Sequence, residues 1–246
     1  MSKNFEMMQK AEQDQEIFLD LNEGKGSANG HKPARVSDRI TKEDTVKLVQ
    51  RLFLLPSAAA PRMVVFSGID RGDGCTSICA RAAEALSGMI EGSCCLVDAN
   101  LRSPGVHEYF QIKNRQGLSE SLARIGPLRD FAQQIYGRKL WVMTAGIMST
   151  DPSELLNSER LTARLAELRE EFSHVLIDAS PVNLFGDAAS LGKQSDGAVL
   201  VLNSSSTRRE AARKGKRVFE DAGVAVLGAV LNRRTFPIPQ GLYGRL

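Results

Sequence analysis

The sequence predicts an α/β fold in which a mostly parallel sheet is covered by helices on both faces. Short apolar runs rich in β-branched residues alternate with longer segments of helical periodicity, as in repeated strand–helix–strand units. The first strand of the main domain runs into a glycine-rich loop, and two later strands end in an aspartate. Because ligands of such sheets bind at the carboxyl ends of the strands, we expect these polar residues to converge on one pocket.

The composition argues against a nucleic-acid-binding, membrane-spanning or secreted protein. A length of 246 residues suits one domain with an appendage, and a net charge of +3 is too small to indicate nucleic-acid binding. No apolar run reaches the ~18–20 residues needed to cross a bilayer. The first residues are polar and acidic where a signal peptide would be apolar. A cytoplasmic protein without a nucleic-acid partner is expected.

The four cysteines do not follow the spacing of a metal site or a disulfide framework. Cys75 and Cys79 are one helical turn apart, and the adjacent Cys94 and Cys95 should face opposite sides of a strand. Since no C-x-x-C pair occurs, we expect neither structural zinc nor disulfides.

Residues 1–40 are predicted to be an appendage, and residues 41–246 the main domain. Apolar positions within residues 4–21 outline an amphipathic helix that is marginal unless it docks on a partner, and glycines within residues 22–39 indicate a flexible linker. Thr41 then has the character of an N-cap, and a helix with a core-facing side follows it.

The main domain then continues as alternating strands and helices, which implies right-handed crossovers between parallel strands. Strands are predicted at residues 63–66, 93–98, 140–143, 174–178, 197–202 and 225–231. Helices are predicted at residues 78–89, 117–122, 128–136, 153–169, 187–194 and 207–222.

The glycine-rich loop lies between the first of these strands and its helix, which is the context of a phosphate-binding loop. Compared with the pattern G-x-x-x-x-G-K-[ST], Ile69 stands at the first glycine and Cys75 at the lysine, whereas Thr76, whose hydroxyl would hold Mg²⁺, is present. We interpret the loop as a nucleotide site altered at its catalytic side chain. The residues predicted to bind the nucleotide are Arg71, Gly72, Asp73, Gly74, Cys75, Thr76, Ser77 and Asn232.

Asp98 and Asp178, the acids at the two strand ends, could hold Mg²⁺ together with Thr76, or position an attacking group. The alternative is that each caps the turn that follows it. Asn232 could likewise read a purine edge or simply form a turn. Arg102 could line the phosphate side or be a solvated surface residue, and the same alternatives apply to His107.

Six basic residues make the segment 207–219 a basic helix, which is either a solvated outer face or a surface for membranes or acidic partners. Tyr243 lies in an Arg-flanked C-terminal segment and is the candidate phosphoacceptor.

Several of these motifs resemble the cytoplasmic domain of bacterial tyrosine kinases (BY-kinases), which are P-loop NTPases of the deviant-Walker type that includes septum-site and plasmid-partition ATPases. The residues that carry the resemblance are 67–77, 95–104 with His107, 117–119, 175–178 with Pro181, and 227–233. The resemblance extends over about residues 41–246. It implies ATP or ADP with Mg²⁺ as cofactors and a role in capsule and exopolysaccharide biosynthesis and export.

The resemblance also assigns roles to single residues. Residues 72–77 are similar to the Walker A motif, and Asp178 to Walker B. Asp98 and Arg102 match the first acid and the arginine of a D-x-D-x-R motif, which makes both catalytic candidates alongside Asp178. Asn232 resembles the asparagine that contacts the base.

The departures from the family concern its catalytic and assembly residues. Cys75 replaces the Walker A lysine, Arg71 a proline, and Asn100 the second acid of D-x-D-x-R. The C-terminal tyrosine cluster is reduced to Tyr243. The Glu/Arg/Arg oligomerisation pattern has as its counterparts Asp44, Lys47 and Gln50.

The family also implies partners. A separate transmembrane chain-length-determinant protein, of the polysaccharide co-polymerase type, would hold the chain at the inner face of the membrane, and a homo-oligomer is a further expectation.

Three hypotheses follow. The first is a BY-kinase-like protein that binds ATP with Mg²⁺ and has weak or absent kinase activity. The second is a non-catalytic regulatory or scaffold subunit, a pseudokinase, of a polysaccharide assembly machine. The third is a redox-responsive switch in which Cys75 gates the pocket. Separately, a helix N-terminus would lower the pKa of Cys75, and a thiolate there would repel phosphate.

Overall fold

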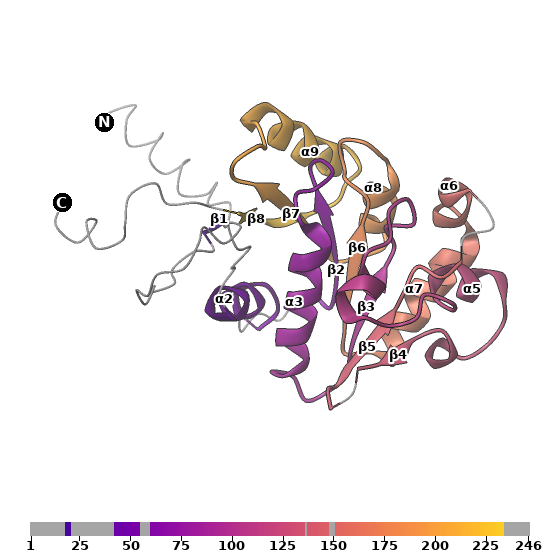
Figure 1. Cartoon of the computed structure of the whole chain (residues 1–246). Coiled ribbons are helices and arrows are strands. Elements are labelled where there is room, and N and C mark those ends of the chain that lie inside the picture. Colours follow the sequence, from indigo (N-terminus) through magenta and orange to yellow (C-terminus); the bar gives the residue numbers. More distant parts are fainter. Residues whose placement is uncertain (1–17, 21–41, 55–59, 136, 148–150, 234–246) are drawn as a thin grey trace, which may run out of the picture.

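The computed structural model describes residues 18–20, of which only the backbone is considered, and residues 42–54, 60–135, 137–147 and 151–233. Within these residues the sheet has eight strands in the order β1-β8-β7-β2-β6-β3-β5-β4 (Figure 1), and all neighbours are parallel except β4 and β5. The strands are β1 (Phe18–Asp20), β2 (Met63–Gly68), β3 (Cys94–Asp98), β4 (Gln133–Gln134), β5 (Leu140–Met143), β6 (His174–Ala179), β7 (Gly197–Asn203) and β8 (Val226–Asn232).

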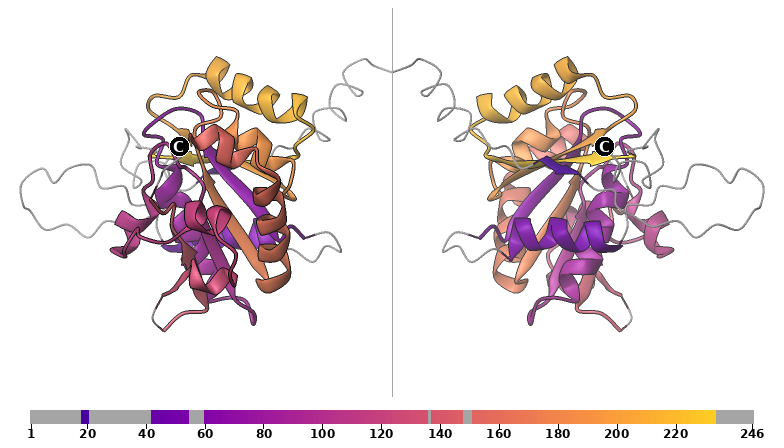
Figure 2. Two further views of the ribbon diagram at one scale, coloured as in Figure 1. Left: turned by 90° about the vertical axis from the view of Figure 1, so that its right-hand side faces the viewer. Right: turned by 90° about the vertical axis from the view of Figure 1, so that its left-hand side faces the viewer.

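Helices cover both faces of this sheet, as the sequence predicts. They are α2 (Lys42–Phe53), α3 (Cys75–Ser87), α4 (Val106–Phe110), α5 (Leu118–Ala123), the 3₁₀ helix η1 (Leu128–Asp130), α6 (Pro152–Leu156), α7 (Glu159–Glu171), α8 (Asp187–Gly192) and α9 (Arg209–Asp221). One apolar core joins α2, α3 and α4 to one face, and a second joins α5 to α9 to the other (Figure 2). Cys94 lies in the first core and Cys95 in the second, so the expectation that they face opposite sides is confirmed, and all four cysteines are free.

Three predicted helices need correction. Residues 18–20, placed in the N-terminal helix, form β1, because the edge strand β8 offers unpaired backbone groups with which they pair. The rest of that helix lies outside the described residues. Residues 128–136 were predicted to be a helix, but they contain only the short η1 and then β4, which pairs antiparallel with β5.

The predicted helix 153–169 is divided into α6 and α7. The break occurs at Ser158, whose Oγ accepts a hydrogen bond from the Leu161 N–H and so caps a new helix. Helix α4, which has only five residues, is not predicted by the sequence pattern. Its N-terminal N–H groups are bound by a buried carboxylate described below, which local sequence does not reveal.

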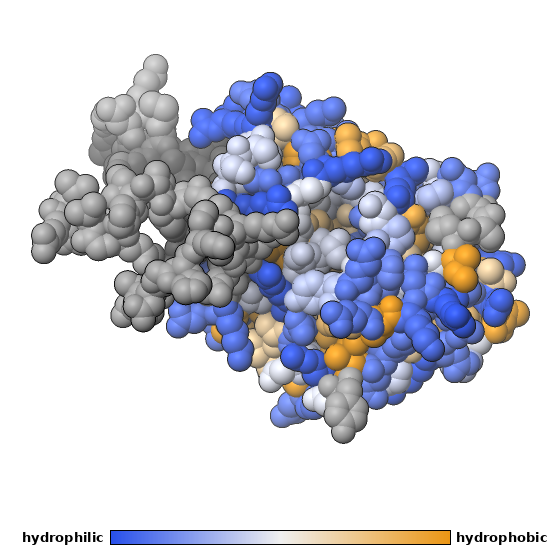
Figure 3. Space-filling model, in the orientation of Figure 1, coloured by the Kyte–Doolittle hydropathy of each residue, from blue (hydrophilic) through white to orange (hydrophobic). Residues whose placement is uncertain are grey.

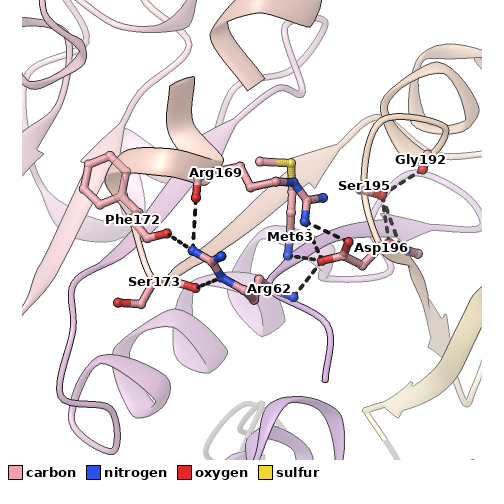
Figure 4. A network of polar contacts seen from close by, with 9 residues as sticks. Arg62, Met63, Arg169, Phe172, Ser173, Gly192, Ser195 and Asp196 are labelled. Carbon is pink, nitrogen blue, oxygen red and sulfur yellow. Dashed lines mark hydrogen bonds and ion pairs between the residues drawn. The ribbon is translucent and has the colours of Figure 1, made fainter. Parts of the chain in front are cut away.

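The N-terminal end of the sheet is closed by a network around Arg62 and Asp196 (Figure 4). The Asp196 carboxylate accepts hydrogen bonds from the Arg62 N–H at 2.7 Å and the Met63 N–H at 2.8 Å, and it pairs with Arg169 at 2.9 Å. The Arg62 guanidinium donates to carbonyl oxygens at the C-terminus of α7, where orphan acceptors need partners. The network therefore ties β2, α7 and the entry to β7 together.

Helix α2 packs on α3, and its inner face buries Leu48, Val49 and Phe53. Asp44 is also buried, at 2% exposure, whereas Lys47 and Gln50 are exposed. The three counterparts of the family's oligomerisation pattern thus do not share one exposed face. Within the described residues, no helix combines the length and apolar character that spanning a bilayer requires.

Candidate functional site

The glycine loop joins β2 to α3 at the carboxyl end of the sheet. Gly72 and Gly74 have φ angles of +85° and +82°, which L side chains rarely adopt. Gly74 is the N-cap of α3 and provides no side chain to cap the helix, so the N–H groups of the first turn are open to an anion. The loop has the backbone that a phosphate cradle requires.

Asp73 and Asn232 hold the loop in shape. One Asp73 oxygen accepts hydrogen bonds from the Ile69 N–H at 2.9 Å and the Asp70 N–H at 2.8 Å, and Asn232 donates through Nδ2 to the Asp73 carbonyl at 2.7 Å. A Cβ on Gly74 would collide with that amide nitrogen. Burial raises the pKa of Asp73. Both residues, predicted to bind the nucleotide, are thus engaged with the loop itself, and base contact by Asn232 stays a prediction.

Cys75 lies in the first turn of α3, near Asp178. Burial, together with the Asp178 charge, raises the pKa of the Cys75 thiol well above its usual range. The expectation that the helix N-terminus lowers this pKa is therefore wrong, because desolvation and a neighbouring anion outweigh the helix end. The raised pKa disfavours the thiolate, and the redox-switch hypothesis stays a prediction.

Asp98 and Asp178 lie directly opposite one another on β3 and β6, and both are completely buried. Asp98 accepts backbone hydrogen bonds from Asn100 at 3.2 Å, Gly105 at 3.1 Å and Val106 at 3.0 Å, so both of its oxygens are occupied and it caps α4. The convergence predicted for these acids is confirmed, and for Asp98 the turn-capping alternative describes its contacts.

Asp178 is bonded differently. Its Oδ2 accepts a hydrogen bond from the Thr76 hydroxyl at 2.6 Å, whereas its Oδ1 is buried without a hydrogen-bond partner in the described part of the chain. A buried carboxylate oxygen left unpaired is costly unless a ligand or ion satisfies it.

Burial raises the pKa of both acids, to about 7 for Asp98, to which the Asp178 charge also contributes, and to about 6 for Asp178. Two carboxylates placed side by side cannot both ionise freely, so the pair titrates as a unit. A cation bound between phosphate oxygens and Asp178 would remove this repulsion.

The residues present fit Mg²⁺ held jointly with a phosphate. No group of three or more His, Cys, Asp or Glu that could hold a metal occurs among the described residues. Thr76 and Asp178 would supply the hydroxyl and the carboxylate near the cation, and Mg²⁺ commonly completes its shell with water and substrate phosphates. Asp98, the third predicted ligand, has no oxygen free of backbone donors.

The two cations predicted to line the site do not contact the acid pair. Arg102 pairs with Asp187 at 2.8 Å, donates to Ser153 Oγ at 2.6 Å and lies over the Phe185 ring. Arg71 is exposed and has no hydrogen bond or ion pair within the described residues. Ser77 lies in the first turn of α3, half-buried. Tyr243 lies outside the described residues.

Two further residues shape the site without a sequence signal of their own. Thr207 hydrogen-bonds the Asp73 carboxylate from 134 positions away. Ser180 donates to Asn100 at 3.1 Å, which fixes the residue that replaces the second acid of the family motif.

Known proteins resemble this chain in sequence. No protein-family model matches it. Tyrosine-protein kinase YwqD of Bacillus subtilis is 34% identical over 137 residues, which are 56% of this chain and 58% of that protein. The putative tyrosine-protein kinase CapB of Staphylococcus aureus is 30% identical over 138 residues, 56% and 60% of the two chains. The chain thus spans about three fifths of the length of these relatives.

Solved structures agree with the fold. The kinase domain of Escherichia coli tyrosine kinase ETK superposes with a TM-score of 0.73 at 25% identity, over 81% of this chain and 80% of that chain. The septum site-determining protein MinD of Pyrococcus horikoshii, complexed with Mg-ADP, superposes with a TM-score of 0.59 at 21% identity, over 75% and 76%. The predicted fold and the resemblance to bacterial tyrosine kinases are both confirmed.

Proposed function

We propose that this chain, whose relatives are bacterial tyrosine kinases, binds ATP or ADP with Mg²⁺ at the glycine loop and transfers phosphate weakly at most. The observation that carries the proposal is the buried, unpartnered Asp178 Oδ1 beside the Thr76 hydroxyl, under an uncapped helix N-terminus. An orphan carboxylate oxygen at that place is best satisfied by a bound cation. When bound, Mg²⁺ neutralises charge on the phosphates.

The backbone does most of the binding in this proposal. N–H groups of the loop and of the first turn of α3 receive the phosphate oxygens, and Gly72 and Gly74 allow the conformation that points them inward. Asp73, Thr207 and Asn232 keep that conformation rigid before the ligand arrives.

The replacement of the Walker A lysine by Cys75 limits both nucleotide affinity and the rate of phosphoryl transfer. A charge-assisted hydrogen bond is worth about 1.5–3 kcal/mol net, so losing the lysine weakens nucleotide binding by about 10- to 150-fold. A donor to charge that develops in the transition state is worth about 2.7–4 kcal/mol, so phosphoryl transfer suffers more than binding. Asp178, Asp98 and Arg102 are the residues proposed to support any residual transfer, and Tyr243 is the proposed acceptor.

The resemblance supports a role for this activity in exopolysaccharide or capsule assembly. The partner would be a separate transmembrane protein of the chain-length-determinant type, which would hold the chain at the inner face of the membrane, and copies of the chain would associate there. These statements rest on the family alone.

A second candidate function is a non-catalytic regulatory subunit, a pseudokinase. The observation that favours it is the engagement of Arg102, the candidate catalytic cation, with Asp187. In this role, nucleotide or the fold alone would organise the assembly machine.

Calorimetric titration of the full chain with ATP, with and without Mg²⁺, tests both candidates. We expect Mg²⁺-dependent binding by the natural protein, the same affinity in Cys75→Ser, which keeps a small neutral donor, and tighter binding by about 10- to 150-fold in Cys75→Lys. Binding only by Cys75→Lys would favour the regulatory subunit. Absence of binding in all three proteins would refute the nucleotide site.

Phosphoryl transfer is tested separately with radiolabelled ATP. We expect weak labelling of the natural chain, stronger labelling of Cys75→Lys, and loss of the label when Tyr243→Phe is added. Intact ATP binding without any label on the chain or on a co-purified partner identifies the regulatory subunit.

A further inference from the structure

Helix α9 carries a concentration of positive charge at the carboxyl end of the sheet. Arg208 and the helix after it contain six basic residues within ten positions, and only one acid, Glu210, lies among them. Five of the six are exposed and the sixth, Lys216, is half-buried. Figure 3 shows this strongly hydrophilic surface along the top of the molecule, where Figure 1 places α9.

The basic side chains point away from the protein because the opposite side of α9 is fixed to the core. Phe219 is completely buried, and Gly215 lies so close to the domain that a Cβ there would stand 2.7 Å from Ile69 Cδ1 and 2.9 Å from Val182 Cγ1. Asn183 also donates to the Ala211 carbonyl at 3.0 Å. At 100° per residue, Arg213 and Arg217 lie on the side opposite this seat.

Arg209 and Lys216 flank those two residues, so the four side chains form a stripe along the outer face, here named the α9 stripe. Most of its charge is not paired within the described residues. Lys216 pairs with Glu220 at 3.6 Å, whereas Arg209, Arg213 and Arg217 form no ion pair with any residue of the described part of the chain. Like charges at this spacing repel one another, which is tolerated where an anionic partner compensates.

We propose that the α9 stripe is a docking surface for the anionic headgroups of a lipid bilayer. A straight helix of 13 residues seated flat on a domain presents its charges to a plane, and each Lys or Arg near an anionic leaflet contributes attraction without needing an apolar anchor. The proposal does not depend on nucleotide binding.

An acidic protein partner fits the surface less well. Stable protein interfaces have an apolar or aromatic centre, and none of the exposed large apolar residues in the described part of the chain lies on α9. Nucleic acid fits less well too, since the whole chain has a net charge of only +3.

The test is flotation of the full chain, without nucleotide, with phosphatidylcholine vesicles that contain or lack phosphatidylglycerol. We expect binding only to the anionic vesicles, and loss of binding as salt rises above physiological strength, because the contacts are exposed. Replacing two basic residues at ~1 kcal/mol each should lower partitioning of the double variant Arg213→Gln/Arg217→Gln by about 30-fold.

The matched control is Arg115→Gln/Arg124→Gln, which removes the same charge from exposed positions outside α9 and should bind like the natural chain. Far-UV circular dichroism checks that both variants fold. Equal loss in both double variants would overturn the proposal, because only net charge would matter. Binding of duplex DNA in preference to anionic vesicles, or no vesicle binding by the natural chain, would also overturn it.

Discussion

The two ends of the sheet both hold aspartates against the strands, but the carboxylates find their partners differently. At the N-terminal end, Asp196 receives two backbone N–H groups and the Arg169 guanidinium (Figure 4). At the carboxyl end, Asp98 and Asp178 face one another, and one Asp178 oxygen has no partner in the described residues.

The pKa values record that difference. Burial raises the pKa of Asp196, but hydrogen bonds from Met63, Arg62 and Arg169 outweigh it, so the pKa lies below its usual value. Burial raises the pKa of Asp98 and Asp178, and for Asp98 the neighbouring charge adds to it. The N-terminal end thus satisfies its carboxylate within the fold, whereas the carboxyl end holds charge that a bound cation or a proton would compensate.

The largest loss of stability is expected when the hydrogen-bond network of Asp196, at the N-terminal end of the sheet, is removed. Asp196→Ala leaves two backbone N–H groups and Arg169 without their acceptor, which should lower the free energy of unfolding by about 2–4 kcal/mol. Urea unfolding followed by circular dichroism measures it. Asp221→Ala, which removes an exposed acid from α9, is the control, and a similar loss there would contradict the role of the network.

At the carboxyl end of the sheet, by contrast, removing a buried carboxylate is expected to increase stability. Asp178→Asn removes the negative charge that Asp98 repels and places an amide donor beside Asp98. The free energy of unfolding of the ligand-free variant should therefore be about 1–3 kcal/mol higher than that of the natural chain near pH 8. The same variant should lose the Mg²⁺ dependence of nucleotide binding. The unfolding free energy of Asp98→Asn should rise less, because the new amide N–H₂ would face backbone N–H donors that the Asp98 oxygens now accept. A destabilised Asp178→Asn would show that Asp178 supports the fold instead.

The pH dependence of stability separates the two ends. The native pKa values of Asp98 and Asp178 exceed the unfolded value of 3.8, so the native state binds more protons and stability should fall as pH rises from about 4 to about 7. The contribution of Asp196 has the opposite sign and is lost as pH falls below 3.8. The difference between the unfolding free energies of the natural chain and of Asp178→Asn, measured against pH, isolates the contribution of the buried acid pair. A difference that does not change between pH 4 and 7 would contradict the raised pKa values.

The smallest loss of stability is expected when the ion pair between Arg169 and Asp196 is removed. Arg169 and Asp196 are about one third exposed, so their ion pair is screened by solvent, and Arg169→Gln should cost only about 0.5–1 kcal/mol. Thermal unfolding of Arg169→Gln and of Asp196→Ala separates the contribution of the ion pair from that of the two backbone N–H donors. Equal losses would mean that the ion pair carries the network.

The sequence alone determined the strands β2, β3, β5, β6, β7 and β8, the loop between β2 and α3, and the meeting of Asp98 with Asp178. These features follow from local properties: β-branched runs form strands, glycines permit left-handed turns, and parallel strands end at one edge. The division of residues 153–169 into two helices was missed although Ser158 is a good N-cap, because the apolar period continues across it.

Only the tertiary structure decided what each polar group does. Asp98 binds the start of α4, Arg102 binds Asp187 85 positions away, Asn232 binds the loop 159 positions before it, and Cys75 is kept neutral by burial beside Asp178. Hydrogen-bond partners and pKa values depend on desolvation and on charges brought close by folding, and neither quantity can be read from neighbouring residues in the chain.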